Sequence, residues 1–128
     1  MKPFHRNEKH LLCIDDYQTA LAGWCLYLQG EGYRVTGAST PQEGLEIFAT
    51  QPVDAVVLDY QMPELTGDAV AATMKKMKPD VPIIMFTGVD LAGEAKSTID
   101  AVVQKGCEPK VLLEFIDEFF CFAEDTAV

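Results

Sequence analysis

The sequence predicts an α/β fold in which one parallel sheet is covered by helices on both faces. Short apolar runs alternate five times with segments of helical periodicity, and no linker or low-complexity stretch interrupts them. Strands that alternate with helices favour right-handed βαβ connections and hence a doubly wound parallel sheet. The length of 128 residues fits one domain. We expect this domain at 9–122, with tails at 1–8 and 123–128.

The five predicted strands are short runs of β-forming residues. The run at 53–59 is almost continuously apolar after Asp54, as a parallel strand covered on both faces should be. The other four predicted strands lie at 10–16, 33–38, 81–88 and 100–106.

The helices are predicted from the recurrence of apolar side chains and from capping residues. The second helix has Thr40 as N-cap, Pro41 in its first turn and Glu43 placed for a capping box. The third is expected to have Thr66 as its cap and to run to about Met77, and a short fourth helix is expected within 91–97. The residues expected on the buried faces of the first three helices are Tyr17, Leu21, Trp24, Leu28, Leu45, Phe48, Val70, Met74 and Met77.

The last helix is predicted from Pro109 to about Phe122, and its apolar stripe is wide. Leu113 and Phe120 flank the stripe. They either face the core or form an exposed surface for a partner or for weak self-association through this helix. The residues of the stripe itself are Leu112, Phe115, Ile116 and Phe119.

Composition excludes several classes of protein. The net charge of −10 argues against direct binding of nucleic acid, and the basic residues Lys2, Arg6 and Lys9 are expected in a solvated tail. No apolar segment approaches the ~20 residues of a membrane span, and the N-terminus lacks the apolar region of a secretory signal. We therefore expect a cytoplasmic protein. Four cysteines without metal-type spacing are expected as reduced thiols, with a redox role as the alternative: Cys13, Cys25, Cys107 and Cys121.

Polar residues follow four of the predicted strands. Asp15 and Asp16 follow the first, Asp59 the third, Thr87 the fourth and Lys105 the fifth. Ligand sites of open parallel sheets lie beyond the carboxyl ends of the strands, so these side chains should meet at one edge. Helix capping by the first two acids and a solvated loop lysine are the ordinary alternatives.

Carboxylates that meet in one crevice repel each other unless a cation lies among them. Oxygen ligands without His or Cys suit Mg²⁺, which takes one or two carboxylates together with water and a phosphate oxygen. A lysine and a hydroxyl at the same edge can bind phosphoryl oxygens. The pattern therefore indicates a carboxylate nucleophile, Asp59, that accepts a phosphoryl group.

These residues resemble the receiver domain of response regulators in two-component signalling. The motifs that carry the resemblance are DD at 15–16, LDYQMPELTG at 58–67, FTG at 86–88 and VVQKG at 102–106. The resemblance covers roughly residues 9–122. It implies a flavodoxin-like (βα)5 fold with sheet order 2-1-3-4-5, as in single-domain chemotaxis regulators.

The resemblance also implies a role for each residue. Asp59 would be the phosphoacceptor, Thr87 would hydrogen-bond the phosphoryl group, and Lys105 would pair with it. The implied ligands of Mg²⁺ are Asp15 (mostly through water), Asp16, Asp59 and the backbone carbonyl of Gln61.

Three departures from the family pattern lie toward the C-terminal side. Gly106 replaces the usual proline after the lysine, and because a cis bond without proline costs about 2.5–4 kcal/mol, we expect a trans bond or a rearranged loop. Val102 stands where the family usually has its switch aromatic. Thr87 and Lys105 are closer in sequence than usual by about one helical turn, roughly 3.6 residues, so the fourth helix is expected to be short or irregular.

The function implied is a phosphorylation-controlled switch, not an independent enzyme. A histidine kinase or histidine phosphotransfer protein would phosphorylate Asp59, and an unknown downstream protein would read the change. One alternative is a pseudo-receiver, a constitutive interaction module that no longer switches. A hydrolase with an aspartyl nucleophile is disfavoured, since the similar phosphatases have DxD where this chain has Gln61.

Overall fold

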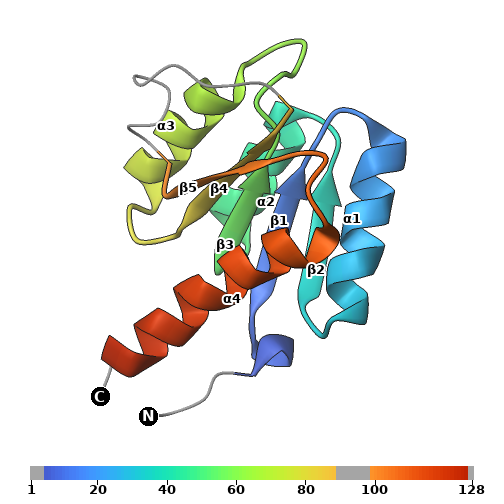
Figure 1. Ribbon diagram of the computed structural model, residues 1–128. Helices are drawn as coiled ribbons and strands as arrows, with labels where there is room; N and C mark the ends of the chain where they lie inside the picture. The colour runs from blue at the N-terminus through green and yellow to red at the C-terminus, as the bar shows by residue number, and fades with distance from the viewer. Residues whose placement is uncertain (1–4, 89–98, 127–128) are drawn as a thin grey trace.

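The strands form one parallel sheet in the order β2-β1-β3-β4-β5, as predicted (Figure 1). The computed structural model describes residues 5–88 and 99–126, with side chains up to Cys121. The predicted fold class is confirmed for these residues. The strands are β1 (His10–Ile14), β2 (Arg34–Ala38), β3 (Ala55–Leu58), β4 (Ile83–Thr87) and β5 (Ala101–Gln104).

Helices cover both faces of the sheet (Figure 1). The short helix expected within 91–97 lies outside the described residues. A short 3-10 turn, η1 (Arg6–Glu8), precedes β1. The α-helices are α1 (Gln18–Gly30), α2 (Pro41–Thr50), α3 (Gly67–Met77) and α4 (Pro109–Thr126).

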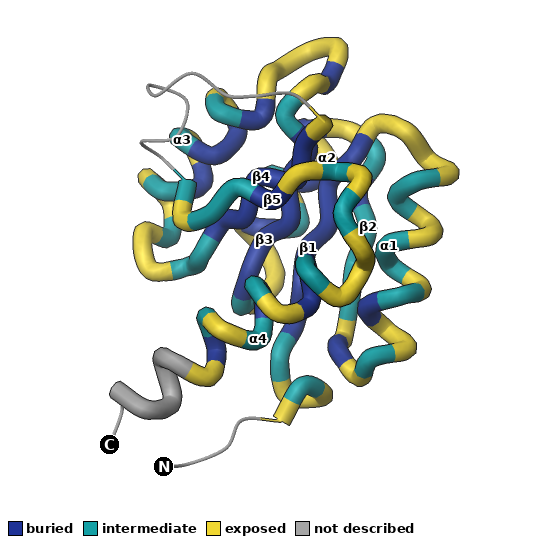
Figure 2. Tube along the Cα trace, in the orientation of Figure 1, coloured by how far each residue is buried: buried dark blue, intermediate teal, exposed yellow. Residues whose placement is uncertain are grey.

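The core has two layers, one on each side of the sheet. Alternate residues of β1 face opposite sides: Leu11 and Cys13 join the layer under α1 and α4, whereas Leu12 and Ile14 join the layer under α2 and α3. Every residue of β1, β3 and β4 is buried, and Figure 2 shows these strands in dark blue. Burial on both faces explains why their sequences are nearly continuous apolar runs.

Capping follows the prediction for one helix and differs for another. The Thr40 hydroxyl accepts a hydrogen bond from the Glu43 backbone amide at 3.1 Å, which confirms the predicted N-cap of α2. Thr66 occupies the N-cap position of α3, but its hydroxyl donates to the Asp68 carboxylate instead of capping the backbone. A charged acceptor two residues ahead competes with the capping geometry.

Two residues predicted on buried helix faces are exposed, so those two predictions are wrong. Tyr17 precedes the first turn of α1, so its side chain lies outside the helical face and is 66% exposed. Met77 is the last residue of α3, and its side chain is also exposed. In both cases the periodic pattern runs one position past the part of the helix that packs on the sheet.

In the last helix, α4, the two residues that flank the apolar stripe also face the core. Leu113 and Phe120 are both buried, which confirms the core-facing alternative and contradicts an exposed surface at these two positions. Phe115 and Phe119, expected to be buried, are only partly so. The helix continues to Thr126, so the predicted tail at 123–128 is helical over four of its residues.

The N-terminal turn is fastened to α4 by a network around Asp117. The Arg6 guanidinium donates to both carboxylate oxygens of Asp117, at 3.1 and 2.6 Å, and to the backbone carbonyl of Glu31 at 3.0 Å. The Tyr33 hydroxyl donates to the same carboxylate. The expectation of a solvated tail is therefore wrong for Arg6, because a two-pronged ion pair holds it.

No helix in the described part of the chain combines the length and apolar character needed to cross a bilayer. All four cysteines are free thiols.

The Asp117 network should contribute measurably to stability. Replacing Asp117 with Ala leaves Arg6 and Tyr33 without their shared acceptor, and we expect a loss of about 1–3 kcal/mol in the free energy of unfolding. Urea denaturation measures this loss. Glu114→Ala, an exposed change one turn earlier in α4, is the control and should stay within about 0.5 kcal/mol of the wild type. Equal effects of the two substitutions would contradict the role given to Asp117.

Candidate functional site

Two acids extend the strand ladder by one residue at the carboxyl edge of the sheet. The Asp59 amide donates to the carbonyl of Ile14 at 2.9 Å, and the Asp15 amide donates to that of Ala38 at 3.1 Å. These bonds continue the parallel register of β3 with β1 and of β1 with β2. The backbone therefore fixes the two acids on adjacent strands at the same height.

Asp15, Asp16 and Asp59 form a cluster in which one carboxylate oxygen of each lies within 4.8 Å of the others. Asp15 and Asp59 are only 6% and 8% exposed, whereas Asp16 faces solvent. Three carboxylates at this separation repel one another strongly unless a cation is shared among them. The prediction that these acids meet at one edge agrees with their positions.

Lys105 supplies one such positive charge. Its Nζ lies 2.8 Å from Oδ2 of Asp15 and 3.3 Å from Oδ1 of Asp59. Burial by itself would lower the pKa of Lys105, but the hydrogen bonds and charges of the two acids outweigh burial and raise it. The lysine is thus a fixed ammonium within the cluster, not the solvated loop residue of the alternative interpretation.

The pKa of Asp59 reflects its enclosed position. Burial raises the pKa above its ordinary value, the ammonium of Lys105 opposes the rise, and the charges of Asp15 and Asp16 add to it. A carboxylate held in this way is costly to keep ionised without a second cation. Any group that brings positive charge to the cluster therefore favours the ionised, nucleophilic form of Asp59.

Asp15 does not cap α1, whose N-cap position is Tyr17, but its carboxylate takes part both in the turn before the helix and in the site. Its Oδ1 accepts from the backbone amide of Tyr17 at 3.0 Å, and its Oδ2 pairs with Lys105. The first bond orients the carboxylate beside the start of α1, and the second directs it toward Asp59. A turn-forming acid and a site acid are the same residue here.

The loop after Lys105 shows why glycine can replace the usual proline. The Lys105–Gly106 peptide is not cis, as expected, and Gly106 has a φ of 98°. A positive φ is costly for residues with a Cβ and easy for glycine. The Lys105 amide donates to the carbonyl of Thr87 at 2.8 Å, so the strand ladder reaches Lys105 before the chain turns.

Gly67 is a structural requirement of the site. A Cβ at this position would lie 2.5 Å from the carbonyl oxygen of Asp59 and 2.8 Å from the Cα of Tyr60. The Gly67 amide also donates to the Tyr60 carbonyl at 2.7 Å, which closes the loop between β3 and α3. The Met85 sulfur would also lie 2.8 Å away, but because the other two crowded atoms belong to the backbone, α3 can approach Asp59 this closely only with glycine there.

Two further residues were predicted for the site, Thr87 and Gln61. Thr87 is buried at the carboxyl end of β4, on the strand between β3 and β5. Gln61 is exposed two residues after Asp59.

Sequence reasoning gave no function to Trp24, which packs edge-on against Phe86 with ring centroids 4.6 Å apart. Trp24 and Phe86 line a small cavity together with Asp15 and Asp59.

Comparison with known proteins agrees with this geometry. Residues 11–117 match the model of the response regulator receiver domain. The response regulator SaeR of Staphylococcus aureus is 36% identical over 78 residues, which cover 61% of this chain and 34% of SaeR. The alignment thus spans about a third of the length of this curated relative.

Solved structures show the same fold. A CheY-like receiver domain protein of Methanospirillum hungatei JF-1 superposes with a TM-score of 0.85 at 28% identity, covering 92% of this chain and 98% of that one. The response regulator TrrA of Thermotoga maritima, solved with Mg²⁺ and BeF, gives 0.82 at 29% identity and coverages of 86% and 97%. TrrA has also been solved in complex with the histidine kinase ThkA.

A parallel sheet in this order, with an acidic cluster and a lysine at its carboxyl edge, defines a CheY-like α/β domain of two-component signalling. The chain belongs to the response regulator receiver domain family.

Two glycine substitutions test the close approach at the site. Gly67→Ala should lower the free energy of unfolding by about 1–3 kcal/mol, because its Cβ would overlap backbone atoms. Gly23→Ala, in the middle of α1 with nothing within 4 Å of the new Cβ, should leave stability unchanged or raise it by up to about 1 kcal/mol. Chemical denaturation measures both. A neutral Gly67→Ala would contradict the proposed crowding.

Proposed function

We propose that this protein is a signalling switch controlled by phosphorylation of Asp59. The observation that carries the proposal is the cluster itself, in which Asp59 lies beside Asp15, Asp16 and the Lys105 ammonium at the carboxyl edge of the sheet. The donor would be a histidine kinase or a histidine phosphotransfer protein. The complex of TrrA with a histidine kinase supports this class of partner.

The donor set fits a hard divalent cation. The described cluster offers three carboxylates and no nitrogen or sulfur ligand, which suits Mg²⁺. Asp15, Asp16 and Asp59 would hold the ion, with the backbone carbonyl of Gln61 as a further ligand. When bound, Mg²⁺ would neutralise charge on the phosphoryl oxygens. The presence of Mg²⁺ with BeF in TrrA supports the assignment.

The chain's own residues would perform the transfer as follows. An oxygen of the Asp59 carboxylate forms a bond to phosphorus as the bond from phosphorus to the donor's imidazole nitrogen breaks, and the departing imidazole keeps the electron pair and takes up a proton. Lys105, now paired with Asp15 and Asp59, would bind a phosphoryl oxygen and so compensate the added charge. The Thr87 hydroxyl would hydrogen-bond another oxygen.

An uncharged surface next to the site is suited to docking the donor. Helix α1 has no charged residue from Gln18 to Gly30, although the whole chain has a net charge of −10. At this helix, Tyr17 and Leu26 are 66% and 69% exposed. Exposed apolar side chains on a helix without charges favour protein contact. A donor bound there would have its phosphoryl group close to Asp59.

Output would occur through protein contact that depends on the phosphorylated state, most simply as a shift between two conformations. Val102, where the family usually has an aromatic residue, is partly buried against the α2 and α3 layer. A coupling that rotates an aromatic ring at that position is therefore not available. The intact acids and Lys105 favour a working acceptor over the pseudo-receiver alternative. The cytoplasm is the compartment in which such a switch would act.

Incubation with acetyl phosphate and Mg²⁺ tests the acceptor. Intact-mass spectrometry should show a gain of one phosphoryl group that requires Mg²⁺ and is absent in Asp59→Asn. No gain in the wild type would favour the pseudo-receiver. Repeated turnover of phosphate esters, measured separately by release of inorganic phosphate, would support a hydrolase.

Asp16 tests the cation site without disturbing the buried acids. Because Asp16 is exposed, Asp16→Asn should fold normally but weaken Mg²⁺ binding by about tenfold or more. Titration followed by Trp24 fluorescence measures the affinity, since this tryptophan lines the cavity beside Asp15 and Asp59. Glu64→Gln removes one charge from an exposed residue outside the cluster and should change affinity less than threefold. Equal affinities in the two variants would exclude Asp16 as a ligand.

A further inference from the structure

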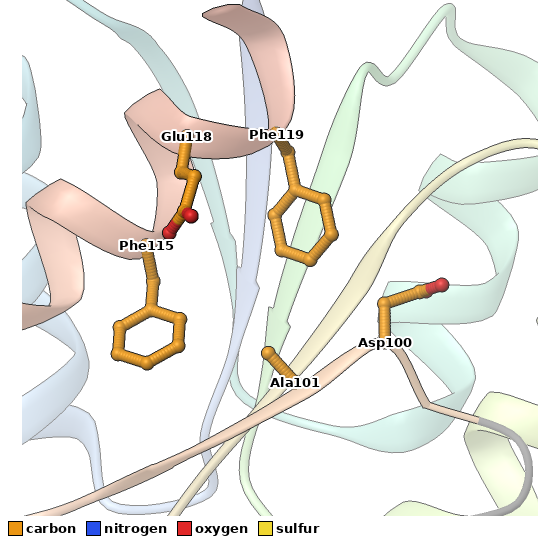
Figure 3. A pocket seen from close by; sticks show the side chains of 5 residues that line it. All are labelled: Asp100, Ala101, Phe115, Glu118 and Phe119. Carbon is orange, nitrogen blue, oxygen red and sulfur yellow. The ribbon is translucent and has the colours of Figure 1, made fainter. Parts of the chain in front are cut away.

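Several polar groups away from the acidic cluster are already held by hydrogen bonds or ion pairs. In the hollow between β5 and α4 (Figure 3), the Asp100 carboxylate accepts from the Ile83 amide and from the Lys75 ammonium. Two cysteines differ from such groups in their chemistry, because a free thiol can be oxidised. Cys13 lies in β1 and Cys25 in α1, and both are free thiols.

The sheet and α1 bring the two sulfurs into the same layer of the core. Cys13 belongs to the buried cluster on the α1 side of the sheet, and Cys25 packs against that cluster. In the parallel register, Cys13 lies directly beside Gly37 of β2. A Cβ added to Gly37 would lie 3.0 Å from the Sγ of Cys25. Because neighbouring strands are about 4.8 Å apart, the Cys25 sulfur lies over the sheet next to Cys13.

The two thiols differ in acidity and in access to solvent. A hydrogen bond from the Cys13 thiol lowers the pKa of Cys25, although partial burial acts in the opposite direction. Cys25 is partly exposed, whereas Cys13 is only 3% exposed. Since oxidation of cysteine follows thiolate character and exposure, a small oxidant reacts first with Cys25. Cys13 is then the neighbouring thiol that can attack the oxidised sulfur.

We propose that Cys13 and Cys25 are an oxidation site for hydrogen peroxide and close to an intramolecular disulfide. The Cys25 thiolate attacks one oxygen of the peroxide, the O–O bond breaks, and the departing hydroxide takes up a proton to give water. The sulfur of Cys13 then attacks the sulfenic acid on Cys25, the S–O bond breaks, and the hydroxide leaves with the thiol proton as a second water. Two thiols lose two electrons, and one peroxide is reduced to two waters.

Formation of this bond would move α1 toward the sheet. A disulfide is much shorter than the contact between two thiols, so the sulfurs must approach each other. Strand β1 is hydrogen-bonded to β2 on one side and to β3 on the other, so α1 is the element that moves. The amide of Tyr17, the N-cap residue of α1, donates to Oδ1 of Asp15 at 3.0 Å. A shift of α1 therefore turns the Asp15 carboxylate.

Oxidation would thereby reach the phosphoacceptor site. This step rests on the proposed function, in which Asp15 is a ligand of Mg²⁺. Cys13 and Asp15 line the same small cavity as Asp59, so the disulfide would form directly beside the cluster. Because the orientation of a ligand governs the affinity for the metal, the oxidised protein should bind Mg²⁺ more weakly.

A single tryptic peptide reports on the disulfide. No Lys or Arg lies between Lys9 and Arg34, so trypsin releases residues 10–34 with Cys13 and Cys25 as their only cysteines. The folded protein is treated with hydrogen peroxide, denatured, alkylated with N-ethylmaleimide and digested. The peptide should lack two hydrogen atoms and carry no alkyl group, and dithiothreitol before alkylation should restore both alkyl groups.

The matched control moves one thiol by a single position along α1. Cys25→Ser with Leu26→Cys keeps the number of cysteines and the same tryptic peptide, but position 26 is 69% exposed. This variant should close the peptide at least about tenfold more slowly than the native pair. Both proteins carry Cys107→Ala and Cys121→Ala to prevent exchange with other thiols, and thermal unfolding checks that each is folded.

Calorimetric titration with MgCl₂ measures the effect on the cluster. The oxidised native pair should bind Mg²⁺ at least about threefold more weakly than its reduced form. The control variant, with and without peroxide treatment, should bind with affinities within about twofold of each other.

Each outcome supports or contradicts a defined part of the proposal. Oxygen adducts on Cys25 with Cys13 still alkylated, or disulfide-linked dimers in place of the closed peptide, would overturn the oxidation site. Equal Mg²⁺ affinities of the closed and reduced protein would overturn the coupling to Asp15. Absence of Mg²⁺ binding in both forms would contradict the proposed function, whereas the mass of the peptide would still decide on the disulfide.

Discussion

Two buried carboxylates, Asp15 and Asp59, share the single ammonium group of Lys105, and the rest of the carboxyl edge is organised around that arrangement. Removing one partner from such a group leaves an uncompensated charge in a poorly solvated place, which is far more costly than the loss of an exposed pair. A third carboxylate, Asp16, brings more negative charge to the same point. The negative charge of the three carboxylates is thus only partly neutralised by Lys105, and a ligand that adds a cation would stabilise the cluster most.

The fold supplies the geometry that this electrostatic arrangement needs. Hydrogen bonds continue the ladder past β1, β3 and β5 to Asp15, Asp59 and Lys105, so three strands bring their polar ends to one edge. Glycine at two places permits what other residues would oppose: the close approach of α3 at Gly67 and the left-handed turn at Gly106.

The sequence predicted the sheet, the four α-helices of the described residues and the convergence of the acids with Lys105, because each depends on short-range patterns read through one rule of α/β topology. It could not predict features that depend on three-dimensional distance. The ion pair from Arg6 to Asp117 joins residues at opposite ends of the chain, and the backbone crowding at Gly67 depends on how closely α3 lies against β3. The partial exposure of Phe115 and Phe119 on the stripe of α4 depends on how closely this helix packs on the sheet. Periodicity gives the face of a helix, but packing decides how much of it is covered.

The most direct test of the central electrostatic claim is thermal unfolding of Lys105→Met and wild type, each with EDTA and with excess MgCl₂. If Asp15 and Asp59 depend on a shared cation, the variant should be less stable in EDTA by about 1–3 kcal/mol. Mg²⁺ should then raise its Tm by more than it raises that of the wild type, because the emptied cluster is more negative and binds the ion more tightly. Equal Mg²⁺ shifts in the two proteins, or no Mg²⁺ response in either, would contradict the account.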